Sequence, residues 1–85
     1  MEIFYLPKFV RQYKKLAAAV KDDAENAENI FRVNPFDKQI ETHKLHGPLR
    51  GLYAFSVNRK YRIIFDFDAD ANVRFYAIGN HDIYE

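Results

Sequence analysis

The stretch LYAFSVNRKYRIIFDFDADANVRFYAI, residues 52–78, decides the fold. It holds three short runs rich in aromatic and β-branched residues, separated by the polar breaks at residues 58–60 and 69–72. Short runs of this composition between Asn- and Asp-rich connectors are typical of strands joined by tight turns. The stretch therefore predicts an antiparallel β-meander.

The two faces of this meander differ in character, because side chains alternate between the faces along a strand. One face is predominantly apolar and aromatic: Tyr53, Phe55, Val57, Tyr61, Ile63, Phe65, Phe67, Val73, Phe75 and Ala77. The other is mixed: Ala54, Ser56, Arg62, Ile64, Asp66, Arg74, Tyr76 and Ile78. We expect the first face to form the core and the second to receive a ligand.

The segment before the meander predicts a strand and two helices. Residues 2–5 (EIFY) are β-prone, and Pro7 suits the first position of a helix, where its missing N–H leaves nothing unsatisfied. The apolar stripe of this helix is Phe9, Tyr13, Leu16 and Val20. A second helix is expected to be capped by Asp22 or Asp23 and to end before Pro35. Its apolar side is Ala24, Ala27, Ile30 and Phe31.

These elements define an α+β fold, in which an N-terminal strand and a helical hairpin pack on an antiparallel β-meander. Residues 35–51 contain two prolines and two glycines and predict a loop that enters the sheet. There is no repeat and no break in composition. We therefore expect one domain over residues 1–85.

Composition excludes several classes of protein. The 85 residues include no cysteine, which rules out disulfides and thiolate–metal sites, and no apolar run approaches the ~18 residues of a membrane span. A cytoplasmic protein without membrane contact is the expectation. Net charge is only +1, yet five cations and one anion fall between residues 41 and 62. The local electrostatic field depends on such clustering of charge more than on the net charge.

Three groups of side chains are candidates for chemistry. They are the loop histidines His43 and His46, the cations Arg59, Lys60 and Arg62, and the tail residues His81 and Tyr84. Folding the loop and the tail over one sheet face would bring them together around the arginine. Histidine accepts or donates a proton near neutral pH, and arginine grips phosphate with a fixed fork. Together these histidines and the arginine supply the groups that acid–base phosphoryl chemistry requires.

Each group also has a structural explanation. The two histidines can be ordinary surface residues, and Arg59 and Lys60 can be charges that keep a hairpin from aggregating. Arg62 can pair with Asp66 or a neighbour, and Tyr84 can pack at the end of the sheet. Metal binding is disfavoured, because His43 and His46 lie in a loop without a carboxylate pair.

The order of elements and three motifs together resemble the RelE/ParE superfamily of toxins from type II toxin–antitoxin systems, in particular the YafQ-like and YoeB-like messenger RNA interferases. The motifs are HKLHG at 43–47, YRIIF at 61–65 and GNHDIY at 79–84. The resemblance implies an endoribonuclease that needs no metal or other cofactor and cuts messenger RNA on the ribosome. It also implies a protein antitoxin as partner, and we expect the free toxin to be a monomer.

By the same resemblance, His43 takes the place of the general base, Arg62 that of the phosphate clamp and His81 that of the general acid. Tyr84 matches a terminal aromatic residue that orients or stacks on the nucleotide, and Lys44, Arg59 and Lys60 would hold the RNA backbone. Two other functions stay open. One is a ParE-like toxin that acts on DNA gyrase without catalysis, and the other is an inactive homologue that only binds a partner.

Overall fold

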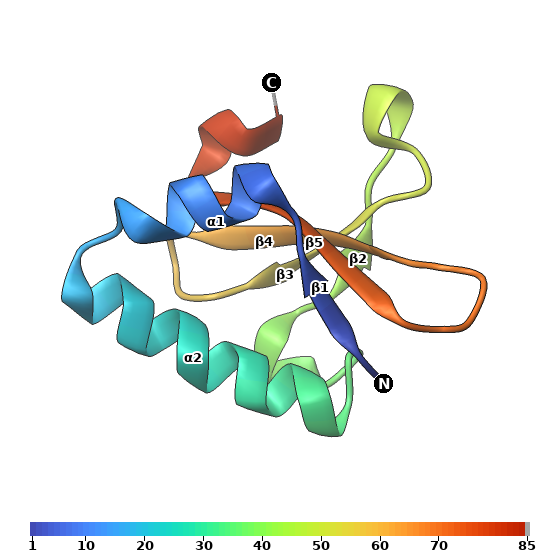
Figure 1. Cartoon of the computed structure of the whole chain (residues 1–85), viewed down its shortest axis with the longest axis horizontal. Coiled ribbons are helices and arrows are strands. Elements are labelled where there is room, and N and C mark those ends of the chain that lie inside the picture. Colours follow the sequence, from blue (N-terminus) through green and yellow to red (C-terminus); the bar gives the residue numbers. More distant parts are fainter. Residues whose placement is uncertain (85) are drawn as a thin grey trace.

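A five-stranded mixed sheet runs through the middle of the molecule (Figure 1). The computed structural model describes residues 1–84, apart from the side chains of His81 and Asp82. The strands follow the order β1-β5-β4-β3-β2. Their bounds are β1 (Ile3–Tyr5), β2 (His43–Lys44), β3 (Tyr53–Ser56), β4 (Arg62–Phe67) and β5 (Val73–Gly79). The predicted antiparallel meander, β3 to β5, is confirmed, and β1 pairs parallel with β5.

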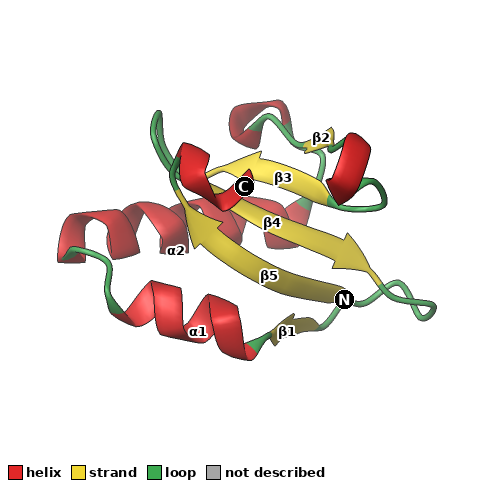
Figure 2. Ribbon diagram, turned by 90° about the horizontal axis from the view of Figure 1, so that it is seen from above, coloured by secondary structure: helices red, strands yellow, loops and turns green. Residues whose placement is uncertain are grey.

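The predicted helical hairpin is also present, as α1 (Pro7–Lys14) and α2 (Ala18–Val33). Figure 2 shows α2 beneath the sheet, with α1 along the β1–β5 edge. No helix within residues 1–84 is long and apolar enough to cross a membrane.

The predicted end of the first helix is wrong, because α1 ends at Lys14 and Val20, predicted for its apolar stripe, lies in α2. The predicted start of the second helix is wrong as well. The helix begins four residues before Asp22, with the extended Ala17 (φ −62°, ψ 151°) at its N-cap, and no side chain caps it. The break between the helices carries neither Gly, Pro nor a capping side chain, so the sequence gives no signal there. Asp23 instead ties α2 to the β3–β4 turn, because its carboxylate accepts a hydrogen bond of 3.0 Å from the side chain of Asn58.

An aromatic cluster centred on Phe31 of α2 joins the helices to the sheet. Its ring lies 4.7 Å from that of Phe55 and meets Phe65 and Phe75 edge-on at 4.9 and 5.5 Å. All four side chains are fully buried. Stacked and edge-on ring pairs at these distances stabilise the core beyond the burial of apolar area. The predicted apolar face of the meander therefore does form the core.

A β-bulge corrects the predicted faces of β5. Ile64 pairs with Ala77 while Phe65 pairs with Phe75, so β5 contains one extra residue at this point. An extra residue reverses the alternation beyond it. As a result Ile78, predicted for the outer face, packs in the core, and Ala77 does not belong to that cluster.

Residues 35–51 are more structured than the predicted loop. They contain the short 3₁₀ turns η1 (Lys38–Ile40) and η2 (Gly47–Leu49), and between them β2, which extends the sheet by pairing with β3. A two-residue strand is too short to leave a periodic pattern in the sequence. Strand β2 matters for the site because it fixes His43 at a defined place on the sheet.

Candidate active site

The face of the sheet turned away from α2 carries Arg62, Ile64 and Asp66 of β4, and we call it the open face. Figure 1 shows α2 on one side of the sheet, and on the other the yellow-green η2 and the red C-terminal turn. That C-terminal turn is η3 (His81–Tyr84). Segments far apart in the sequence thus flank one face.

His43 is placed on the open face by strand pairing. It lies directly opposite Ala54, which pairs with Ile64, which in turn pairs with Ala77. Directly paired residues of antiparallel strands point to the same face. The imidazole of His43 is exposed, whereas the small and aliphatic side chains on the same face, Ala54, Ile64 and Ala77, are nearly fully buried.

Arg62 lies at the start of β4, between Ser56 on one side and Gly79 on the other. Its Nη1 donates to the backbone carbonyl of Asn58 at 2.7 Å and to that of Tyr61 at 3.0 Å. Two neutral acceptors in the β3–β4 turn thus orient the guanidinium without cancelling its charge. Among the described side chains, Arg62 takes part in neither of the two ion pairs.

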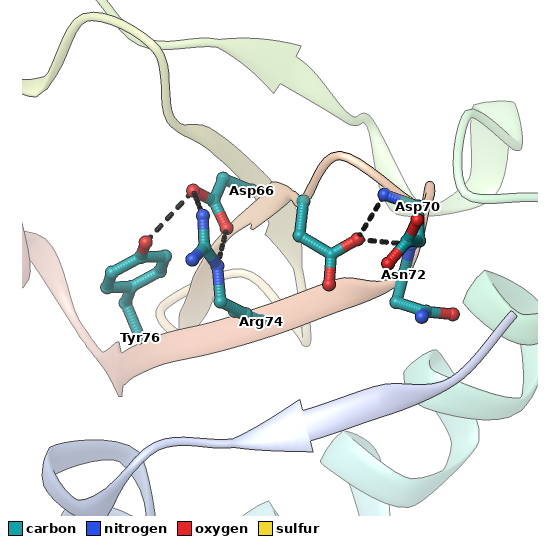
Figure 3. A network of polar contacts seen from close by, with 6 residues as sticks. Asp66, Asp70, Asn72, Arg74 and Tyr76 are labelled. Atoms are coloured by element: carbon teal, nitrogen blue, oxygen red, sulfur yellow. Dashed lines mark hydrogen bonds and ion pairs between the residues drawn. The ribbon is translucent and has the colours of Figure 1, made fainter.

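Asp66, proposed from the sequence as one partner of Arg62, bonds Arg74 instead, so the predicted pair between Arg62 and Asp66 is wrong (Figure 3). Nε and Nη2 of Arg74 donate to its two oxygens at 2.8 and 2.7 Å, and the Tyr76 hydroxyl donates at 2.9 Å. Burial and the hydrogen bond to Asp66 both raise the pKa of Tyr76. Both carboxylate oxygens of Asp66 are therefore hydrogen-bonded to residues of β5.

The C-terminal turn folds back beside Arg62. At Gly79, opposite Arg62, an added Cβ would lie 2.2 Å from Cγ2 of Ile83, so any larger residue there would require the Ile83 side chain to move. Burial raises the pKa of Tyr84 and the charge of Arg62 lowers it, which places the phenol within electrostatic reach of the guanidinium. The backbone of His81 lies in the same turn, but its side chain falls outside the described residues.

Two residues that sequence reasoning missed hold His43 and its surroundings. Nδ1 of His43 lies 3.1 Å from the backbone carbonyl of Glu41, and the carboxylate of Glu41 accepts a hydrogen bond of 3.0 Å from the hydroxyl of Ser56. Glu41 has φ 52°, a left-handed conformation unusual outside glycine. No sequence motif marks such a turn.

The other predicted cations and the second loop histidine are spread more widely. Arg59 and Lys60 are exposed in the β3–β4 turn, close in sequence to Arg62. Lys44 follows His43 on β2 and pairs with Tyr53, so it points to the opposite face. His46 is exposed at the start of η2.

Cavity size does not identify this site. The larger hollow, about 530 Å³, lies between α1 and α2 and is lined by Tyr5, Phe9, Tyr13 and Glu28 among others. A smaller one of about 270 Å³ lies beside the C-terminal turn and includes Tyr61, Gly79 and Ile83. Among the described side chains, no three metal-binding groups lie close enough together to hold an ion.

Comparison with known proteins rests on solved structures. No family model and no curated protein matches the sequence. A YoeB/ParE toxin from Agrobacterium tumefaciens superposes with a TM-score of 0.80 at 12% identity, over 95% of this chain and 99% of that one. YafQ from E. coli gives 0.76 at 19% identity, over 98% and 96%. YoeB in the heterotetrameric YoeB–YefM toxin–antitoxin complex of Staphylococcus aureus gives 0.76 at 18%, over 95% and 97%.

The architecture is therefore that of the RelE/ParE-type toxins. Within that class, the matched structures include YoeB and YafQ, so the resemblance predicted from the sequence is confirmed at the level of the fold.

Proposed function

We propose that the protein is the toxin of a type II toxin–antitoxin system and acts in the cytoplasm as a ribosome-dependent messenger RNA endoribonuclease. The observation that supports this proposal is that strand pairing puts His43 and Arg62 on the same face of the sheet, with the charge of Arg62 acting on Tyr84. A base, a cation and an aromatic ring from distant parts of the chain suit cleavage of a phosphodiester.

The proposed reaction uses the roles that the family resemblance implies for these residues. Nε2 of His43 removes the proton of a ribose 2′-hydroxyl, and the oxygen attacks the adjacent phosphorus. Arg62 donates to the non-bridging oxygens as negative charge builds on them. The P–O5′ bond breaks, and His81 gives a proton to the leaving oxygen. The products are a 2′,3′-cyclic phosphate and a free 5′-hydroxyl, with no metal required.

The remaining predicted residues hold the substrate. Tyr84 stacks on a nucleobase or orients it, an interaction that tolerates any base. Arg59 and Lys60 contact the RNA backbone next to Arg62. Lys44 is on the opposite face and reaches only RNA that passes around the β2 edge of the sheet.

A cognate antitoxin is the proposed protein partner. The S. aureus neighbour is described in complex with YefM, a toxin–antitoxin pair. We expect the toxin to be monomeric when free and to be inhibited when its antitoxin binds.

Expression in bacteria tests the proposal. The wild type should arrest growth and produce messenger cuts at ribosome positions in toeprinting, whereas Arg62→Ala and His81→Ala should do neither. Arg11→Ala, an exposed arginine of α1, is the matched control and should behave as the wild type.

Two outcomes contradict it. Arrest with DNA damage and intact messenger would indicate the ParE-like alternative, a toxin that acts on DNA gyrase. No arrest and no cut by the wild type would indicate an inactive homologue.

A further inference from the structure

We propose that Glu41 is a positioning residue that fixes the tautomer and the orientation of His43. The effect of Glu41 on the tautomer of His43 does not depend on what the protein does. The effect on catalysis rests on the proposed nuclease function. The control is exerted by the peptide carbonyl of Glu41 and by its carboxylate.

The peptide carbonyl selects the tautomer. It lies 3.1 Å from Nδ1 of His43 and can only accept a hydrogen bond. Nδ1 of the neutral ring must therefore carry the proton, which leaves the lone pair on Nε2. An imidazole free in water samples both tautomers, so this contact prepares the nitrogen that acts as the base.

The backbone of Glu41 is bent to make this contact. Its φ of 52° and ψ of 41° close η1, where its N–H donates to the carbonyl of Lys38 at 3.3 Å. Within residues 1–84, Ala71 is the only other non-glycine residue with positive φ. Strained conformations persist where the surrounding structure holds them, and they cluster at functional sites.

The carboxylate is what holds the bend. One oxygen of Glu41 accepts the 3.0 Å hydrogen bond from Ser56, a nearly buried residue directly opposite Arg62 in the β3–β4 ladder. No ion pair among the described side chains involves Glu41. The hydrogen bond thus connects the residue that orients the base to the strand beside the phosphate clamp, and so sets the position of the base relative to the clamp.

Three variants separate the parts of this arrangement. Glu41→Gly tolerates the positive φ but removes the anchor, and Ser56→Ala removes the other half of the hydrogen bond. Glu41→Gln keeps an acceptor oxygen for Ser56 and removes the charge. Glu25→Gln, on the exposed side of α2, is the matched control. Circular dichroism and thermal unfolding of each variant show whether it folds.

The readouts are the ¹⁵N chemical shifts of the His43 ring and the kinetics of RNA cleavage. The wild type and Glu41→Gln should show Nδ1–H. Glu41→Gly and Ser56→Ala should show mixed tautomers, with kcat lower by about 10- to 100-fold at unchanged KM. The two changes combined should cost no more than one of them, since both remove one interaction.

Several results would overturn the proposal. A wild-type ring protonated at Nε2 removes its basis, and so do folded Glu41→Gly and Ser56→Ala variants that keep the wild-type tautomer and rate. Loss of cleavage in Glu41→Gln with the tautomer intact would mean that the carboxylate itself reacts. If the wild type cleaves no RNA, the nuclease function fails, while the ring shifts still decide what Glu41 does to His43.

Discussion

Asp66 binds Arg74, not Arg62, which lies four residues earlier on the same strand and the same face. The two arginines of the open face therefore have different kinds of partner. One arginine is neutralised in a two-pronged ion pair, whereas the other is held by the carbonyls of the β3–β4 turn. Among the described side chains, Arg62 takes part in no ion pair, and its guanidinium is held at the β3–β4 turn.

Replacing Arg62 by lysine should slow cleavage although the charge is kept. Lysine lacks the planar fork that grips a phosphate and at the same time bonds the carbonyls of Asn58 and Tyr61. We expect cleavage at least about tenfold slower, the effect of losing one charge-assisted hydrogen bond. Single-turnover cleavage of messenger on programmed ribosomes measures it, and an unchanged rate would remove the clamp role.

Replacing His43 by glutamine should remove the general base. The expected loss in rate is about 10²–10⁴-fold, without loss of stability, because the imidazole is exposed. His46→Gln is the matched control, three residues along the chain, and should retain activity. Equal losses in both variants would mean that the two rings act together, and no loss in His43→Gln would exclude it as the base.

Replacing Phe31 by alanine should destabilise the fold strongly. The ring is fully buried among Phe55, Phe65 and Phe75, so its removal leaves a cavity between α2 and the sheet. The expected loss is about 3–5 kcal/mol in the free energy of unfolding, measured by urea denaturation. Phe36→Ala, which removes a ring that is 54% exposed, should cost much less. Similar losses would contradict the assigned centre of the core.

Stability should fall above pH 10 in part through Tyr5. Burial, followed by the hydrogen bond to Glu28, raises the pKa of this phenol above its ordinary value of 10.0. The unfolded chain therefore loses the proton first, so this contribution is complete below pH 10 and is lost as the pH rises through the folded-state pKa. Urea denaturation at pH 9 and pH 11 should show a smaller fall for Tyr5→Phe than for the wild type. Parallel curves would contradict the coupling between β1 and α2.

The fold could be predicted because its signals are strong and local. The aromatic alternation of residues 52–78 gave the meander and its buried face, and Pro7 and Pro35 marked helix boundaries correctly. The errors have physical causes. A bulge in β5 exchanged Ala77 and Ile78, and a helix break without Gly or Pro was placed too late. Neither feature changes composition enough to be seen in one sequence.

The residues of the candidate site could be proposed from the sequence, but the residues that hold them in place could not. His43 and Arg62 stood out by residue type and position, and strand pairing brings them to one face. Glu41 and Ser56 could not be found, because their roles depend on a left-handed turn and on a hydrogen bond between residues 15 apart in the chain. The position of the His81 ring stays a prediction.

The most direct test of the nuclease account is the chemistry of the RNA ends made in a purified translation system. The wild type should leave a 2′,3′-cyclic phosphate on the upstream fragment and a 5′-hydroxyl on the downstream one. His81→Ala, which lacks the proposed proton donor, should leave the messenger whole on the same timescale. Intact messenger with the wild type, or fragments that carry a 5′-phosphate, would contradict the account.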